Sequence, residues 1–589
     1  MRHRFVLLLS LILGVTFSIP ARAEVTICTA SGTQDQVAVA PGDSSAVVVW
    51  RDNRYDATGN PYDIFASRRN YFLNPTLSSL SDGADECAVA GSQTEPAVAV
   101  GPDGATWIAW RDFRTPCSTY GQVWVQAIAP AGSTFCSPNG RLVASFGCDD
   151  GMRSPTIIST SPGTGIIIWH RKRDTGIGGE TYDSIWAQKL SASGCAAQWG
   201  ASGVQIHDHG FGSASGTSVL IPSAVSDGSG GVLVVWYYAS RLYARRVDSA
   251  GNVLWTAPLR VCTTEVLQQN PSLAADGSGG VIITWEQGAA GARTVLAQRI
   301  DANGVVQWGN AGKVIAGPGG GDLRNPQIVR STLGRSFIIW EADYAPPHSD
   351  IFAQRINIFG DTLAARIPVC TAPYGQTVPK AAAGPNGSCY IVWQDGRGGI
   401  GEDDIFAQKL DVSGNVVGPV DGCSFAGVPG SDDGTQSNPR IVPVEIGGST
   451  TLPGAHALVV WSDTRAATLP NPTDIYAAPM SDPCFPGVLA VGPRTPDARS
   501  LITNLPNPFS RFTKIRFQLI EQSTVTLRVY DMGGRLVRVL AGSEHMGPGE
   551  HEVEWNGITE AGSRATPGVY FYRLTTERQT QTSHMLFLK

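Results

Sequence analysis

Charge is scarce in this sequence. Charged side chains make up 16% of its 589 residues, and the formal net charge is −6. A nucleic-acid-binding domain needs a basic patch or stripe, and no cluster of lysine and arginine supplies one. The same shortage excludes an electrostatic patch for an anionic membrane surface. We therefore expect no nucleic-acid partner and no polybasic membrane contact.

Catalytic and metal-binding signatures are also missing. The sequence has no G-x-S-x-G, no H-E-x-x-H, no phosphate-binding loop and no dinucleotide fingerprint. None of the eleven cysteines has the paired C-x-x-C spacing that indicates a zinc site. We accordingly assign no catalytic residue and predict no cofactor, with calcium as the one exception considered below.

Long apolar runs are absent except at the N-terminus. There a basic segment, residues 2–4, precedes the apolar residues 5–19, and Ala21-Arg22-Ala23 follows as a small-x-small cleavage site. This order predicts a signal peptide at residues 1–23. A membrane anchor is the alternative, but about 15 apolar residues are few for a span. The mature chain is therefore expected to be exported and soluble, without a transmembrane segment.

Glycine (68) and proline (38) are abundant, which is typical of a turn-rich, all-β protein. Residues 378–417 contain the clearest copy of a repeat. A short strand, a Gly-Pro-Asn-Gly turn and an apolar strand ending at tryptophan are followed by a polar loop, an alternating strand and a hairpin turn. Alignment on the tryptophan gives eight copies: Trp50, Trp110, Trp169, Trp236, Trp285, Trp340, Trp393 and Trp461.

Four-stranded repeats of this length predict a β-propeller within residues 24–480, with eight blades and seven as the alternative count. The second strands are apolar on both faces, so each must be covered by two neighbouring blades. We assign the eight tryptophans to this packing rather than to ligand binding. A parallel β-helix or a string of hairpins competes, but the variable loops and the period of roughly 55 residues argue against both.

The sequence also predicts how the ring closes. The last copy stops after its third strand, at Met480. Residues 27–30 (ICTA) resemble residues 369–372 (VCTA), which belong to the fourth strand of another copy. We infer that residues 25–30 supply the missing strand of the last blade.

The cysteines lie in the exported part of the chain, where disulfides can form. Cys28, Cys262 and Cys370 recur at one position of the repeat, which makes them strand residues of different blades. Three others crowd a single repeat and are the better disulfide candidates: Cys117, Cys136 and Cys148. The odd total leaves at least one thiol free or paired between chains, and the connectivity stays open.

Four loops between second and third strands begin with aspartate followed two positions later by arginine, and several end at another aspartate. Paired carboxylates at the ends of a loop could bind calcium or act as acid and base. The metal candidates are Asp52 with Asp63 and Asp395 with Asp404. In the alternative interpretation each aspartate pairs with the nearby arginine and ties the loop together. Because the pattern recurs, we favour this structural role.

The third copy departs most from the others. His170 follows Trp169 and is followed by three cationic residues, so this loop could form a local binding site. A solvated charged loop is the alternative. His207 and His209 are further candidate ligands, although two histidines with one intervening residue are a weak signal.

The sequence pattern changes after a linker, residues 481–499. Residues 500–589 contain about seven short alternating strands, which predicts a small Ig-like sandwich. Several short motifs follow one another there: Leu-Pro-Asn-Pro-Phe, Val-Tyr-Asp-Met-Gly-Gly-Arg, Gly-Val-Tyr and a terminal Leu-Phe-Leu-Lys. The residues that carry these motifs are Pro506, Asn507, Pro508, Tyr530, Asp531, Gly533, Arg535, Gly568, Tyr570 and Lys589.

This C-terminal segment resembles the sorting domain of type IX (Por) secretion, which shares its Ig-like fold with the flagellar hook-capping protein. Ser510-Arg511 and Asn556 depart modestly from the family pattern. The resemblance implies export across an outer membrane, with the secretion machinery as a partner, and attachment to the cell surface. Related domains occur in bacteria without that machinery, so surface display by another route stays open.

These observations predict a secreted or cell-surface bacterial protein. Its propeller is expected to bind or adhere to an unknown extracellular ligand, which could be a glycan, a polymer or a protein. The alternative is a secreted carbohydrate-active enzyme, a glycoside hydrolase or lyase, that uses the variable loop face. An unpaired cluster of acidic, histidine or tyrosine side chains at the channel mouth would favour the enzyme, whereas eight similar rims would favour binding.

Overall fold

The computed structural model divides the chain into two compact units, within residues 1–490 and 491–589. The structure describes residues 25–30, 32–42, 45–54, 62–70, 84–87, 89–114, 121–146, 150–174, 181–208, 221–317, 319, 321–331, 334–345, 348–398, 403–426, 435–443, 457–464, 473–480, 503–505, 509–519, 522–531, 535–547, 549–576 and 580–588. These residues form strands and two short 3-10 turns, η1 (Pro385–Gly387) and η2 (Gly396–Gly398), but no α-helix. The predicted signal peptide and linker lie outside the described residues.

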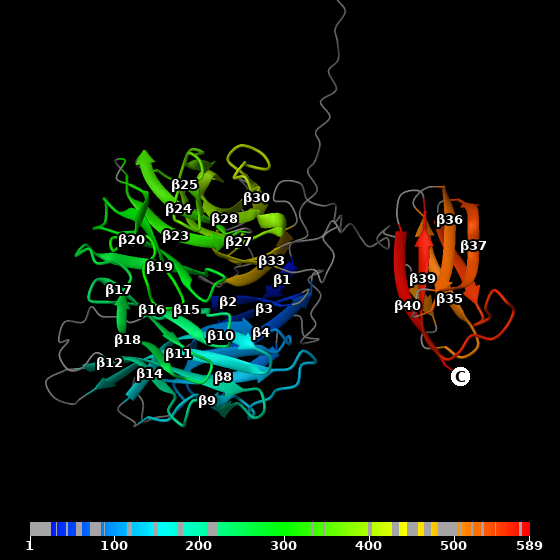
Figure 1. Cartoon of the computed structure of the whole chain (residues 1–589), viewed down its shortest axis with the longest axis horizontal. Helices are drawn as coiled ribbons and strands as arrows, with labels where there is room; N and C mark the ends of the chain where they lie inside the picture. The colour runs from blue at the N-terminus through cyan, green and yellow to red at the C-terminus, as the bar shows by residue number, and fades with distance from the viewer. Residues whose placement is uncertain are drawn as a thin grey trace, which may run out of the picture. The chain divides into compact units, whose positions relative to one another are not determined.

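The first unit is a β-propeller whose described residues form eight antiparallel sheets, here called blades 1 to 8 (Figure 1). The strands of blades 1 and 2 are β2 (Gln34–Gly42), β3 (Ser45–Asp52), β4 (Asp63–Asn70), β5 (Ala84–Cys87), β6 (Gln93–Val100), β7 (Thr106–Asp112), β8 (Gln122–Ile128) and β9 (Arg141–Leu142). Those of blades 3 and 4 are β10 (Asp150–Ser161), β11 (Thr164–Asp174), β12 (Thr181–Ser191), β13 (Ala196–Ala197), β14 (Val204–Asp208), β15 (Ser223–Ser226), β16 (Val232–Tyr238), β17 (Arg241–Val247) and β18 (Val253–Arg260).

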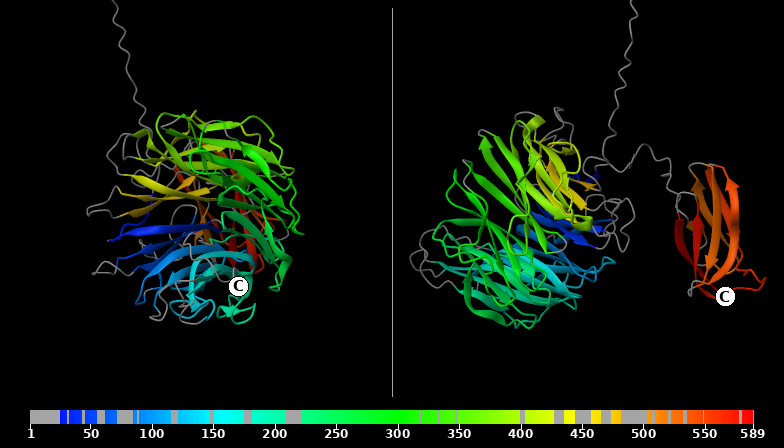
Figure 2. Two further views of the ribbon diagram at one scale, coloured as in Figure 1. Left: turned by 90° about the vertical axis from the view of Figure 1, so that its left-hand side faces the viewer. Right: turned by 45° about the horizontal axis from the view of Figure 1, so that its top comes forward.

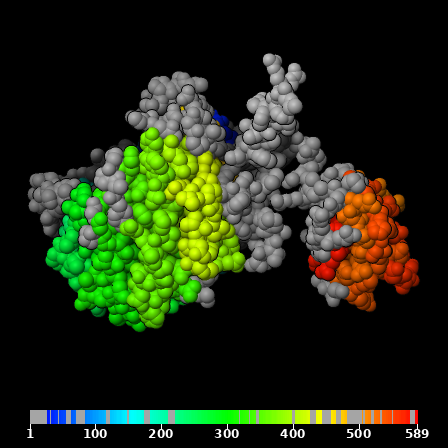
Figure 3. Space-filling model, turned by 90° about the horizontal axis from the view of Figure 1, so that it is seen from above, coloured from blue at the N-terminus to red at the C-terminus, as the bar shows by residue number. Residues whose placement is uncertain are grey.

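Blades 5 to 8 follow the same order. Blades 5 and 6 contain β19 (Gln268–Ala275), β20 (Val281–Gln287), β21 (Thr294–Ile300), β22 (Lys313–Ala316), β23 (Leu323–Arg330), β24 (Arg335–Ala345), β25 (His348–Asn357) and β26 (Ile367–Cys370). Blades 7 and 8 contain β27 (Gln376–Ala383), β28 (Cys389–Asp395), β29 (Asp404–Leu410), β30 (Cys423–Ala426), β31 (Gln436–Pro443), β32 (Ala457–Asp463), β33 (Asp474–Met480) and β1 (Val25–Cys28). The space-filling view shows blades 4 to 7 as adjacent bands, green to yellow (Figure 3). The prediction of eight blades is confirmed.

The first strand of the chain closes the ring, as its similarity to residues 369–372 predicted. Strand β1 pairs antiparallel with β33, and Val25 lies opposite Ala477. Figure 1 shows the blue β1 beside the gold β33, and Figure 2 shows blade 1 between blade 8 and blade 2. Blade 8 is therefore built from both ends of the propeller sequence.

The core lies between the blades. Eight buried apolar clusters among the described residues each combine residues of two neighbouring blades. All eight repeat tryptophans are 0% exposed, and each belongs to the cluster shared with the preceding blade. On the third strand of blade 6, Phe352 faces the preceding blade and Ala353 the following one. A large and a small side chain thus lie on opposite faces of this strand.

A disulfide joins two blades in a way that the sequence did not reveal. Cys136, between β8 and β9 of blade 2, is bonded to Cys195, between β12 and β13 of blade 3. Cys136 was one of the three candidates, and its partner, which the sequence left open, lies in the next blade because outer hairpins of neighbouring blades lie side by side. Cys117 and Cys148 lie outside the described residues. Five cysteines of the described residues form no disulfide and are buried: Cys28, Cys87, Cys262, Cys370 and Cys389.

The second unit is a two-sheet sandwich with its own core. One sheet has the order β34 (Thr503–Leu505), β35 (Thr513–Leu519), β38 (Gly549–Trp555). The other has the order β37 (Leu536–Met546), β36 (Ser523–Tyr530), β39 (Gly568–Thr575), β40 (Thr580–Phe587). Its buried cluster, which includes Trp555, contains only residues of this unit.

Candidate functional site

The aspartates that begin the loops after the second strands accept hydrogen bonds from a tryptophan and an arginine of their own blade. We call each such group of aspartate, tryptophan, arginine and third-strand aromatic a corner. In blade 1, Trp50 Nε1 donates to Asp52 Oδ2 over 3.0 Å, and Arg54 forms an ion pair with the same oxygen at 2.5 Å. The Arg54 guanidinium lies 3.9 Å from the centre of the Phe65 ring. One carboxylate therefore holds the tryptophan and an arginine that covers the third-strand aromatic. The arrangement recurs with Trp110, Asp112, Arg114 and Trp124 in blade 2, and with Trp393, Asp395, Arg397 and Phe406 in blade 7.

A buried cysteine from the preceding blade completes each of these corners. Arg54 Nη2 lies 2.9 Å from Cys28 Sγ, and Arg397 Nη2 lies 3.0 Å from Cys370 Sγ. Burial raises the pKa of Cys370 to about 12, so its side chain is a neutral thiol at physiological pH. The cysteines that recur in the repeat are thus contacts between blades.

The four predicted metal ligands lie in two cross-strand pairs. Asp52 is opposite Asp63, and Asp395 is opposite Asp404. The carboxylates of Asp52 and Asp395 already accept from tryptophan, arginine and a backbone N–H. Within the described part of the chain, no group of three or more histidine, cysteine or acidic residues could hold a metal ion. Calcium binding stays a prediction, and an ion would have to compete with the arginines.

The histidine of the third blade is part of a buried chain of hydrogen bonds. Arg153 Nε donates to His170 Nδ1 over 3.0 Å, and His170 Nε2 lies 2.6 Å from Asp183 Oδ1. Burial lowers the pKa of His170, so the ring is neutral and donates through Nε2. His170 therefore connects the three inner strands of blade 3. The His207 ring lies 5.1 Å from the Trp236 ring, centre to centre, and is tilted by 31° to it, whereas His209 lies outside the described residues.

Sequence reasoning missed a bulge that recurs in the innermost strands. Seven of the eight described first strands change register against their second strand. Each bulge holds a non-glycine residue at a φ near +50°, which is uncommon. These residues are Gln36, Glu95, Ser154, Asn270, Asn325, Val378 and Asn438. The proline that follows six of them was the available signal.

The bulges in the first strands connect neighbouring blades. The N–H of Asn325 donates to Glu286 Oε1 of the preceding blade over 2.8 Å, and the N–H of Val378 donates to Glu341 Oε2 over 3.2 Å. Both glutamates directly follow the tryptophan of their own second strand. In blades 1 to 3 the acceptor is instead the side chain of the bulge residue in the preceding blade. The N–H of Glu95 donates to Gln36 Oε1, and the N–H of Ser154 donates to Glu95 Oε2.

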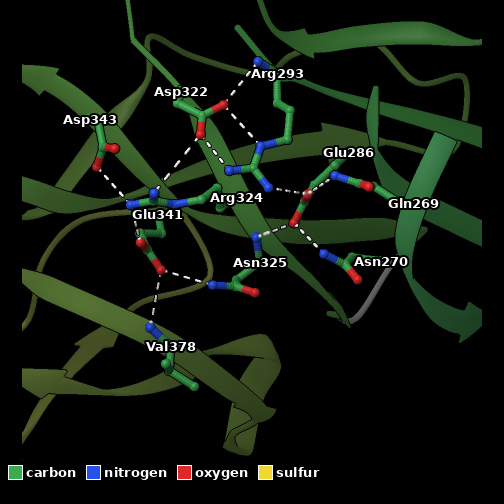
Figure 4. Close-up of polar contacts among 10 residues, drawn as sticks. All are labelled: Gln269, Asn270, Glu286, Arg293, Asp322, Arg324, Asn325, Glu341, Asp343 and Val378. Carbon is green, nitrogen blue, oxygen red and sulfur yellow. Dashed lines mark hydrogen bonds and ion pairs between the residues drawn. The ribbon is translucent and has the colours of Figure 1, made fainter. Parts of the chain in front are cut away.

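The densest part of this network lies in blades 5 and 6 (Figure 4). Glu286 is 0% exposed and accepts from Gln269 Nε2 at 3.0 Å, Asn270 Nδ2 at 2.9 Å and Arg293 Nη1 at 3.1 Å. Arg293 also forms an ion pair with Asp322, and hydrogen bonds from this arginine hold the pKa of Asp322 at about 2. Glu286 is therefore compensated on both oxygens.

Blade 6 has the same arrangement around Glu341, the residue equivalent to Glu286 of blade 5. Glu341 accepts from Arg324 Nη2 at 2.5 Å and from Asn325 Nδ2 at 2.9 Å. Arg324 also contacts Asp343 at 2.8 Å. Burial raises the pKa of Asp343 above its usual value, although the positive charge of Arg324 opposes this. The two buried glutamates thus connect blades 5, 6 and 7.

The described residues among those that resemble a sorting-domain motif lie at a turn, a strand start and the core of the second unit. The Arg535 N–H donates to Asp531 Oδ1 over 2.9 Å in the hairpin that follows Tyr530. Gly568 begins β39, and buried Tyr570 donates its hydroxyl to the carbonyl of Thr566 over 2.6 Å. Five motif residues lie outside the described residues: Pro506, Asn507, Pro508, Gly533 and Lys589.

Comparisons with known proteins identify the C-terminal unit most directly. Residues 511–580 match the family described as FlgD Ig-like domain. The propeller is similar to several solved structures, all at low identity. A polysaccharide lyase, an ulvan lyase, is 10% identical with a TM-score of 0.39, covering 65% of this chain and 91% of its own. The α-L-arabinofuranosidase of Fusarium graminearum is 10% identical with a TM-score of 0.35, covering 67% and 96%.

The endo-arabinase from Bacteroides thetaiotaomicron is 12% identical with a TM-score of 0.29, covering 45% of this chain and 95% of its own. At these identities and scores, none of the three assigns a substrate or a reaction to this chain. The comparison with curated protein sequences gives no match. Among the residues described by the structure, no helix is long and apolar enough to cross a membrane.

Proposed function

We propose that the protein is an extracellular binding protein. Its propeller binds a glycan, a polymer or a protein, and its C-terminal unit directs export. The observation that carries the binding role is that the buried carboxylates of Glu286 and Glu341, on the second strands of blades 5 and 6, already accept from arginine, amide and backbone donors. A general acid or base must instead exchange a proton with the substrate, and glycoside hydrolysis usually needs two such carboxyl groups.

Repetition supports the same proposal. The tryptophan–aspartate–arginine corner occurs in three described blades with nearly the same distances, and the bulge occurs in seven. A single active site would require one blade to differ at these positions in a way that exposes reactive groups. The strongest departure, His170, is buried and bonded through both ring nitrogens. The variable loops on a rigid ring are therefore left as the binding surface.

Binding without cleavage is the expected result when the mature chain is mixed with polysaccharides. Calorimetric titration with arabinan, pectin and ulvan, and with gelatin as a protein probe, would detect binding. Chromatography of the same mixtures would detect shortened chains. Glu286→Gln and Glu341→Gln should leave any binding unchanged, because neither carboxylate is assigned to a ligand. New chain ends that disappear in either variant would establish the enzyme alternative.

Export is the expected role of the C-terminal unit, as the resemblance of its motifs to sorting domains suggests. A chain truncated after residue 493 should fold, because the propeller cores contain only earlier residues. In the native host it should then accumulate in the periplasm, while the full chain reaches the surface or the medium. Immunoblots of cell fractions would measure this. Normal amounts of truncated protein outside the cell would contradict the sorting role.

A further inference from the structure

Two cationic side chains occupy neighbouring positions at the centre of the propeller. Lys380 belongs to β27 of blade 7 and Arg440 to β31 of blade 8. The first strands of successive blades contact one another around a closed ring, from β2 through β31 and back to β2. Figure 1 shows these strands, including β2, β10, β15, β19, β23 and β27, around the centre. Lys380 and Arg440 therefore lie on adjacent members of the innermost ring.

The strand registers show that the two residues are equivalent and that their charge is unusual. In every blade one first-strand residue lies opposite the residue that precedes the repeat tryptophan, as Lys380 lies opposite Val392 and Arg440 opposite Val460. The other six members of this layer are neutral, and most are small: Ala38, Ala97, Thr156, Ser223, Ser272 and Gln327. One side of the central layer thus carries two positive charges and the rest carries none.

Among the described residues, neither cation has an acidic partner. Lys380 makes no hydrogen bond or ion pair with the described residues, and Arg440 donates only to the carbonyl of Pro439, over 3.2 Å. Some other charged residues near the ends of the inner strands have partners of opposite charge, as Asp35 has Arg51 and Arg324 has Glu341. Burial, and then the nearby charge of Arg440, lower the pKa of Lys380 to about 8, so its ammonium group is still protonated at neutral pH.

Two partly buried like charges without a counter-ion are unfavourable in the empty protein. An anion between them would compensate both. Arginine presents a planar fork that suits two oxygens of one group, and lysine adds a compact positive charge. The other six residues of the layer are neutral, so Lys380 and Arg440 are the residues of this layer that would attract an anion.

We propose that the centre of the ring between blades 7 and 8 binds an oxyanion, held by Lys380 and Arg440. Sulfate, phosphate and carboxylate share the required chemistry. The group could be a free ion or the acidic substituent of an extracellular polysaccharide. This site is independent of the proposed loop-face binding, because it uses different residues on the innermost strands.

The test is calorimetric titration of the mature full-length chain with sodium sulfate, against sodium chloride at matched ionic strength. Sulfate should bind saturably at one site per chain, and Lys380→Gln and Arg440→Gln should each weaken it at least tenfold. Lys380→Arg, which keeps the charge, should retain binding. Lys313→Gln removes one exposed charge of blade 5 and should change nothing. Circular dichroism would verify that each variant is folded.

A second arm distinguishes the sources of the oxyanion. A sulfated oligosaccharide that binds with the same dependence on Lys380 and Arg440 would assign a polymer-borne group, whereas binding of inorganic sulfate alone would assign a free ion. Unaltered sulfate binding by the double variant Lys380→Gln/Arg440→Gln would overturn the proposal. So would the absence of saturable binding by wild-type protein, or an equal loss of binding in Lys313→Gln.

Discussion

Removing residues 24–30 is expected to destabilise the propeller by on the order of 5 kcal/mol, through the loss of two buried side chains and several strand hydrogen bonds. Strand β1 is the fourth strand of blade 8, and its Ile27 and Cys28 are 0% exposed in the cluster between blades 8 and 1. Without it, β33 becomes an exposed edge and that cluster is open to water. The midpoint of thermal unfolding, measured by calorimetry, should fall markedly.

Point variants within the same strand show how much of the destabilisation comes from the loss of buried side chains rather than from shortening the chain. Ile27→Ala should reproduce a large part of the effect, because truncation of a buried isoleucine costs about 2–5 kcal/mol. Thr26→Ala should have little effect, because Thr26 is exposed. A synthetic peptide of residues 24–30 should partly restore the midpoint of the shortened protein. An unchanged midpoint after the deletion would show that β1 does not hold the ring closed.

Truncating the buried glutamate of blade 5 is expected to have an effect of similar size. Glu286→Ala removes a fully buried carboxylate that accepts from Gln269, Asn270, Arg293 and the N–H of Asn325. Removing one partner of a buried ion pair typically costs about 3–5 kcal/mol, because the remaining donors lose their compensation. Chemical denaturation followed by tryptophan fluorescence would measure the loss.

Two controls define what this carboxylate contributes. Glu286→Gln keeps the shape and one acceptor oxygen and should cost less than Glu286→Ala. Glu265→Ala removes a carboxylate that also contacts two arginines, Arg241 and Arg260, but is 74% exposed. Since surface ion pairs contribute little, this variant should unfold almost as the wild type does. Equal losses in Glu286→Ala and Glu265→Ala would mean that burial does not set the energetics of the network.

The eight-bladed architecture could be predicted because its signal is local. Each blade contains its own tryptophan, apolar strand and hairpin turn, so one repeat can be recognised from about 50 consecutive residues. Ring closure was also predictable, because β1 resembles a fourth strand in composition. The Cys136–Cys195 disulfide was not, since it depends on two hairpins that are neighbours only in the folded ring.

The polar network around Glu286 and Glu341 could not be predicted, for a different reason. Its geometry depends on bulges at residues such as Asn325 and Val378, which have a positive φ. The side chains of these residues do not require that backbone conformation. The bulge turns a backbone N–H toward the preceding blade, and the alternation of apolar residues in the sequence does not predict this. Lys380 and Arg440 likewise look like ordinary polar residues until the strand registers align them.

The use of the first strand to complete the last blade determines when the propeller can finish folding. Val25 and its partner Ala477 are about 450 positions apart, and contacts so distant in sequence form late. In a chain delivered from its N-terminus, on a ribosome or across a membrane, β1 waits unpaired until β33 emerges. Until then the blades can form only an open, curved array with two exposed ends. Closure of the ring therefore has to wait until β33, which ends at Met480, has been delivered, and a chain that stops before that point cannot reach the stable closed state.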